Sequence, residues 1–131
     1  MVRYADRQIT DAIFDRIGEN AFIAREVHDL IAPMDSAAFL RRMMGIGWVV
    51  RISKRKNTHM ATYRLSITAV RRILTDRVLR DPQIALDYRD GRISLDELAA
   101  QTRQDPWAVS LFLRNHYPAL FSGMGEEQEA V

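Results

Sequence analysis

Nine basic side chains and no acidic side chain lie between Asp35 and Asp76. The basic residues are Arg41, Arg42, Arg51, Lys54, Arg55, Lys56, Arg64, Arg71 and Arg72. Cations concentrated in this way attract a polyanion, and nucleic acid is the simplest polyanion in a cell. The alternative is a solvated surface without a ligand, because runs of like charge often serve only solubility. The secondary-structure elements that carry these side chains determine whether they form a binding surface or only a solvated one.

The distribution of charge along the chain is uneven, although the net charge is only +2. Residues 1–80 contain 15 Lys and Arg and eight Asp and Glu, a net charge of +7. Residues 81–131 contain four Arg and nine Asp and Glu, a net charge of −5. The sequence therefore predicts that a polyanion binds to the N-terminal part.

Other residue types offer little support for catalysis. The chain has no Cys, which excludes disulfides, thiol nucleophiles and thiolate metal ligands. His28, His59 and His116 lie far apart and lack the close spacing of metal ligands. Neither a glycine-rich phosphate loop nor a nucleophile motif is present. We therefore expect a protein that is not an enzyme and that uses no cofactor and no metal.

Length and composition indicate an ordinary globular protein. The chain has 131 residues, of which 47% are hydrophobic and 27% charged. The longest apolar run, Met43 to Val50, is far shorter than the roughly 20 residues that span a bilayer. The N-terminal residues alternate charged and apolar types, which is not typical of a signal peptide. We expect a soluble, cytoplasmic protein.

Apolar periodicity predicts four helices and one hairpin in the first 80 residues. A third helix, capped by Asp35 or Ser36, carries Arg41 and Arg42. Its apolar Phe39, Met43 and Met44, and Trp48 after it, are expected in the core. Two alternating strands then flank a basic tip, which predicts a β-hairpin. The expected helices are 6–17, 22–31, 37–44 and 68–79, the last capped by Thr68, and the strands are 48–54 and 60–66.

The sequence after residue 80 predicts a small helical region. Asp81-Pro82, a capping box at Ser94 and Glu97, and Asp105-Pro106 each mark the start of a helix. The last two helices have the spacing of a wingless helix-turn-helix, for which we favour a packing or subunit-contact role because this part is acidic. We predict a mainly α protein in three parts: 1–80, 81–122 and a flexible acidic tail, 123–131.

One segment resembles a known DNA-binding family. Leu40-Arg41-Arg42-Met43-Met44-Gly45-Ile46-Gly47-Trp48-Val49-Val50-Arg51, followed by Tyr63-Arg64-Leu65-Ser66, is similar to the end of the winged helix-turn-helix domain. Such endings occur in regulators of the multiple-antibiotic-resistance and arsenic-repressor types. The resemblance covers about 70 of the 131 residues and implies a winged helix-turn-helix fold.

The resemblance also implies a DNA-binding surface. It places Ala37, Ala38, Arg41 and Arg42 on the exposed side of a helix that reads the major groove, where arginine binds guanine and alanine permits close approach. The basic hairpin would contact phosphates, which orient the protein without reading sequence. The complete expected set is Ser36, Ala37, Ala38, Arg41, Arg42, Arg51, Lys54, Arg55, Lys56, Asn57 and Arg64.

Three alternatives stay open at this level. The arginines and the hairpin cations would also suit a solvated surface or a protected sheet edge. A winged helix can instead bridge proteins in a replication, segregation or chromatin assembly. RNA binding is weaker, since only Trp48 and Tyr63 lie near the basic stretch for stacking. We favour a transcriptional regulator that binds duplex DNA as a homodimer, with 68–79 or the helices after Asp81 in the interface.

Overall fold

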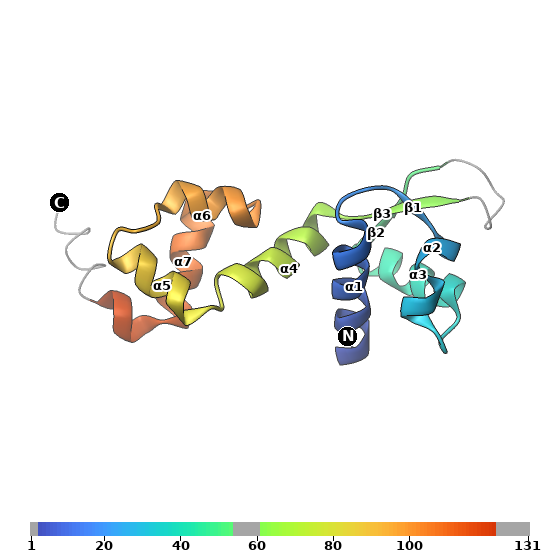
Figure 1. Cartoon of the computed structure of the whole chain (residues 1–131), viewed down its shortest axis with the longest axis horizontal. Helices are drawn as coiled ribbons and strands as arrows, with labels where there is room; N and C mark the ends of the chain where they lie inside the picture. Colours follow the sequence, from blue (N-terminus) through green and yellow to red (C-terminus); the bar gives the residue numbers. More distant parts are fainter. Residues whose placement is uncertain (1–2, 54–60, 123–131) are drawn as a thin grey trace. The chain divides into compact units, whose positions relative to one another are not determined.

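The computed structural model describes residues 3–53 and 61–122. The chain is mainly helical, with a small three-stranded antiparallel sheet (Figure 1). It divides into two compact units, Met1–Val70 and Arg71–Val131, so that the division falls ten residues before the boundary expected at residue 80. Within the described ranges, no helix has the length and apolarity needed to cross a bilayer.

Three helices of the first unit lie close to their expected positions: α1 (Tyr4–Ile17), α2 (Ala24–Ile31) and α3 (Ser36–Gly45). Asp35 is the N-cap of α3, because its carboxylate accepts a hydrogen bond from the Ala38 amide at 3.0 Å. Gly47 has φ +82°, a conformation that L side chains rarely adopt, and it turns the chain from α3 toward the sheet.

The sheet has three strands rather than the two of the expected hairpin. The strands are β1 (Phe22–Ile23), β2 (Val49–Arg51) and β3 (Thr62–Leu65), in the order β1-β3-β2. The expected helix from Phe22 is wrong in its first two residues, because Phe22 pairs with Tyr63 and Ile23 with Thr62. Apolar residues suit a strand as well as a helix, and a partner forty residues away decides between them.

The core of the first unit lies between these helices and one face of the sheet. Phe39, Met43 and Trp48 are buried, which confirms their expected core role, and Met44 is partly buried. The other large buried side chains of this unit are Ile13, Phe22, Val27, Ile31, Leu40, Val49, Tyr63, Leu65 and Val70.

The helix after the sheet, α4 (Ile67–Val78), begins at a different cap from the expected Thr68. The Ser66 hydroxyl accepts from the Ala69 amide at 3.1 Å and donates to the Gly47 carbonyl at 2.6 Å. Ser66 therefore both caps α4 and joins it to the turn after α3. Thr68 lies exposed in the first turn.

The second unit contains α5 (Pro82–Arg89), α6 (Leu95–Thr102) and α7 (Pro106–His116), and residues 118–122 are again helical. Asp81, Ser94 and Asp105 cap these helices through their side chains, as the sequence predicts. The α6–α7 turn places Arg103 in the left-handed region at φ 57°. Buried Leu79, Ala85, Leu98, Ala99, Val109, Leu113 and Phe121 form the core of this unit.

Candidate nucleic-acid interface

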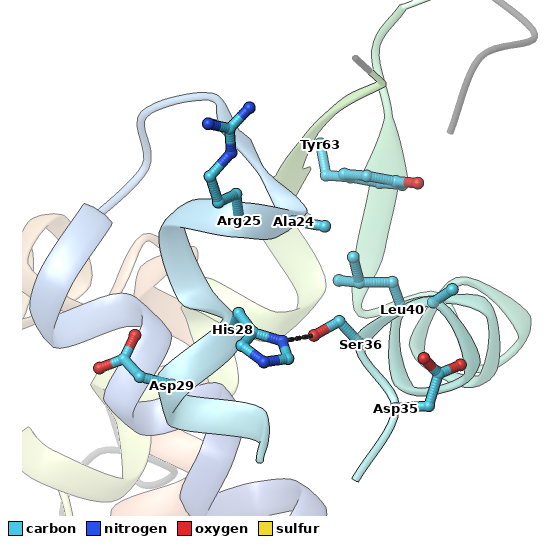
Figure 2. Close-up of a pocket in the computed structure, with 9 residues that line it drawn as sticks. Ala24, Arg25, His28, Asp29, Asp35, Ser36, Leu40 and Tyr63 are labelled. Atoms are coloured by element: carbon cyan, nitrogen blue, oxygen red, sulfur yellow. Dashed lines mark hydrogen bonds between the residues drawn. The ribbon is translucent and has the colours of Figure 1, made fainter. Parts of the chain in front are cut away.

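The first residue of α3, Ser36, belongs to the expected DNA-binding set but is buried. Its hydroxyl lies 2.9 Å from His28 Nδ1 in a hydrogen bond between α2 and α3 (Figure 2). Ser36 therefore joins the two helices and does not project into solvent.

Ala37 and Arg41 are the exposed members of the expected reading set on α3, and Ala38 is partly buried. Ala37 and Arg41 are four residues apart, so they lie on one face of the helix. Arg41 has no hydrogen-bond or ion-pair partner among the residues that the structure describes. This face thus presents one small and one long cationic side chain to solvent.

Arg42 points the other way, which corrects its expected exposed position. Its Nη2 lies 2.6 Å from Oδ1 of Asp6 in α1, and its guanidinium lies 5.8 Å from the centre of the Phe39 ring. The Asp6 side chain is 1% exposed and that of Arg42 34% exposed. A buried carboxylate needs a nearby cation, and Arg42 supplies it.

A pocket of about 510 Å³ lies between α2 and α3, and Tyr63 of β3 also lines it. Figure 2 shows Ala24 and His28 on α2, Leu40 and Ser36 on α3, and the Tyr63 ring across one end. The pocket therefore combines apolar walls with polar groups from two helices, a combination typical of binding sites.

Some of the charged groups around this pocket already bind another group of the protein, and others can bind a ligand. Arg16 binds Asp29 through both carboxylate oxygens, at 2.6 and 2.9 Å. The hydrogen bond from Arg16 lowers the pKa of the Asp29 carboxyl below its ordinary value, and the same pair raises the pKa of Arg16. Asp35 is engaged as the α3 cap. Arg25 is exposed and has no partner among the described residues, so it is the available cation of the pocket.

Arg51 and Arg64 lie on opposite faces of the sheet. Arg51 pairs with Tyr63 across β2 and β3, whereas Arg64 pairs with exposed Val50. Cross-strand partners share a face, and successive residues alternate between faces. Arg51 is therefore on the face that carries the pocket-lining Tyr63, and the structure separates Arg64 from the α3 residues.

The expected hairpin contacts Lys54, Arg55, Lys56 and Asn57 lie outside the described residues. Two pocket residues, Arg25 and His28, were missed by the sequence reasoning. Both precede the stretch between Asp35 and Asp76 that has no acidic residue. Their only sign in the sequence is that they lie three residues apart on the helix before the one expected to enter the major groove.

Comparison with known proteins gives no relative from which a function would follow. The chain matches no protein-family model, no curated protein and no solved structure. Any assignment must therefore come from the residues and geometry of this chain.

Proposed function

We propose that the first unit is a winged helix-turn-helix domain that binds duplex DNA and that the protein regulates transcription. The element order α1-β1-α2-α3-β2-β3 and the strand order β1-β3-β2 support this proposal. In this arrangement α3 follows α2 after a short turn and the β2–β3 hairpin forms the wing.

The observation that carries the proposal is the exposed face of α3. Ala37 permits close approach of the helix backbone, and Arg41 extends from the same face without a described partner. An arginine on a helix in the major groove donates two hydrogen bonds to O6 and N7 of guanine. In this proposal Arg41 is the base-reading residue, and Arg42 holds α3 against α1.

Phosphate contacts complete the proposed interface. Arg25 at the start of α2 is an exposed cation at the pocket beside α3, and Arg51 is an exposed cation on the Tyr63 face of the sheet. The basic segment Lys54–Lys56 extends the same charge along the chain. Each phosphate contact releases counterions, which makes affinity dependent on salt.

Salt-dependent binding to a random-sequence duplex tests the proposal. Arg25→Ala should reduce the magnitude of the negative slope of log K against log salt by about 0.9, the value of one phosphate contact. Arg64→Ala is the matched control, because it removes the same charge from the opposite face of the sheet. We expect the control to retain the wild-type slope.

The role of Arg41 in base reading is tested by a second measurement, the affinity for a DNA site selected from a random library. Arg41→Ala should weaken binding to the selected site by about 1–3 kcal/mol and affect the random duplex much less. Failure of the full chain to bind any duplex at low salt would contradict the proposal. That result would favour a protein-interaction module on the same scaffold.

A further inference from the structure

One face of α7 in the second unit carries two large apolar side chains that are exposed among the described residues. Trp107 is 71% exposed and Leu111 is 42% exposed. Together with Ser110 and Arg114 they follow the spacing i, i+3, i+4 and i+7 on one face of the helix. The opposite face buries Val109 and Leu113 in the core of the unit. We call these four residues the α7 stripe.

The α7 stripe also borders a shallow pocket. Leu95 at the start of α6 and all four residues of the stripe line this pocket, which has a volume of about 250 Å³. A large apolar side chain fits such a pocket, and tryptophan, which lines it here, is enriched among the residues that contribute most to binding at protein interfaces. The surface therefore has both a projecting anchor and a recess.

The charges along α7 make the stripe complementary to a reversed copy of itself. Asp105 caps the N-terminal end of α7, and Arg114 lies in its last turn. Antiparallel pairing of two α7 helices brings Asp105 of each copy toward Arg114 of the other. Opposed helix dipoles favour the same orientation.

We infer that the α7 stripe binds the α7 stripe of a second copy of this chain, antiparallel and around a two-fold axis between Ser110 and Leu111. Residues 107 and 114 are about 10 Å apart along a helix, so both ends of the stripe match in this register. Trp107 then lies against the Arg114 guanidinium of the other copy, a favourable cation–π pair. The small Ser110 side chain accommodates Leu111 across the axis.

Nucleic acid fits the stripe less well. Asp96, Glu97 and Asp105 lie at the starts of α6 and α7, beside Leu95 and Trp107, and their carboxylates repel phosphates. Two of the four stripe residues, Trp107 and Leu111, are also too apolar to replace hydrogen bonds to base edges. The α7 stripe has four residues, against about 20–30 a side in a standard interface, so we expect a weak association with a dissociation constant in the micromolar range. This inference is independent of the proposed DNA binding.

Disulfide trapping of the full chain tests the register. The chain has no Cys, so Ser110→Cys introduces a single thiol next to the proposed two-fold axis. Ala100→Cys, on an exposed position of α6, is the matched control. Under mild oxidation, Ser110→Cys should form covalent dimers at least tenfold faster than Ala100→Cys. Equal rates for the two variants would overturn the inference.

Sedimentation equilibrium without DNA tests the association itself. Wild type should approach twice the 15.1 kDa chain mass at high micromolar concentration. Trp107→Ala and Leu111→Asp should each weaken association at least tenfold, whereas Tyr4→Ala, which removes an equally exposed aromatic from the first unit, should leave it unchanged. The melting temperature of each variant, measured in parallel, shows that it is folded.

Three results would overturn the inference. One is a monomeric wild type throughout the concentration range. Another is loss of DNA affinity in Trp107→Ala or Leu111→Asp with unchanged association, which would make the stripe a nucleic-acid contact. A third is a chain ending at residue 122 that stays monomeric while the full chain associates, which would assign the association to residues 123–131.

Discussion

Arg41 and Arg42 are adjacent in the sequence and chemically identical, but α3 gives them different surroundings. A rotation of about 100° per residue directs Arg41 to solvent and Arg42 toward Asp6 of α1. Removing the charge of Arg41 is therefore expected to affect ligand binding, and removing the charge of Arg42 is expected to affect the stability of the fold.

Arg42→Ala should destabilise the first unit, because the Asp6 carboxylate stays buried without its cation. We expect the free energy of unfolding to fall by about 2–3 kcal/mol. This is less than the loss of about 3–5 kcal/mol that follows from breaking a fully buried ion pair, because the Arg42 side chain is partly exposed. Arg41→Ala should change it by less than about 0.5 kcal/mol. Urea unfolding of both variants measures the difference, and equal stabilities would contradict the assigned roles.

The surroundings of Tyr117 predict that the fold loses stability at alkaline pH. Its hydroxyl donates to the Leu79 carbonyl at 2.9 Å, and burial raises the pKa of the phenol above its ordinary value. The unfolded chain then loses this proton first, so Tyr117 stabilises the fold fully below about pH 10 and less as the pH rises through the raised pKa.

Tyr117→Phe should therefore cost about 1 kcal/mol at neutral pH and remove part of the decline above about pH 10. Denaturant unfolding at pH 8 and above, with exposed Tyr4→Phe as the control, measures both effects. A decline that is as steep in Tyr117→Phe as in wild type would exclude this tyrosine as its source.

At the scale of elements, the start of α4 depends on a contact that the local pattern does not contain. Ser66→Ala removes the cap of α4 and the hydrogen bond to Gly47, so we expect a loss of about 1–2 kcal/mol. Thr68→Ala removes an exposed hydroxyl two residues later, in the first turn of α4, and should be nearly neutral. Thermal unfolding distinguishes the two, and a larger effect of Thr68→Ala would restore Thr68 as the cap.

The strand β1 illustrates the limit of element prediction. Its two residues, Phe22 and Ile23, continue the apolar stripe that predicts a helix, and the backbone of α2 begins directly after them. The capping interaction of Glu26 with the Ile23 amide at 2.8 Å ends the strand and starts the helix. A two-residue strand has no periodicity of its own, so only its pairing with β3 reveals it.

At the scale of the whole molecule, the division into two units changes the charge contrast. Divided after residue 70, the chain has net charges of +4 and −2 rather than the +7 and −5 obtained at residue 80. All three arginines of α4 belong to the second unit. Three acidic residues of this unit, Glu126, Glu127 and Glu129, lie outside the described residues. The first unit remains basic under either division.

Each unit has its own buried cluster, which predicts a local response to core substitutions. Leu98→Ala removes a fully buried side chain from the cluster of the second unit and should cost about 2–5 kcal/mol there. Hydrogen exchange should lose protection in α6 and α7 and keep it in α1 to α3. An equal loss of protection in both units would mean that the chain unfolds as one cooperative body.

The sequence by itself determined the features that local rules specify. Periodicity located the helices to within a few residues, and the caps at Asp81, Ser94 and Asp105 followed from side chains that satisfy the first helical amides. Burial of Phe39 and Trp48 followed from their size and apolarity.

Only the tertiary structure decided which polar side chains are occupied and which remain available. Asp6 lies 36 residues from Arg42, and neither position carries a local sign of the pair. The bond between His28 and Ser36, the strand β1 and the separation of Arg51 from Arg64 likewise depend on contacts between distant segments. A residue type and its spacing specify a helix face, but its partner across the fold determines whether that face is buried or open to a ligand.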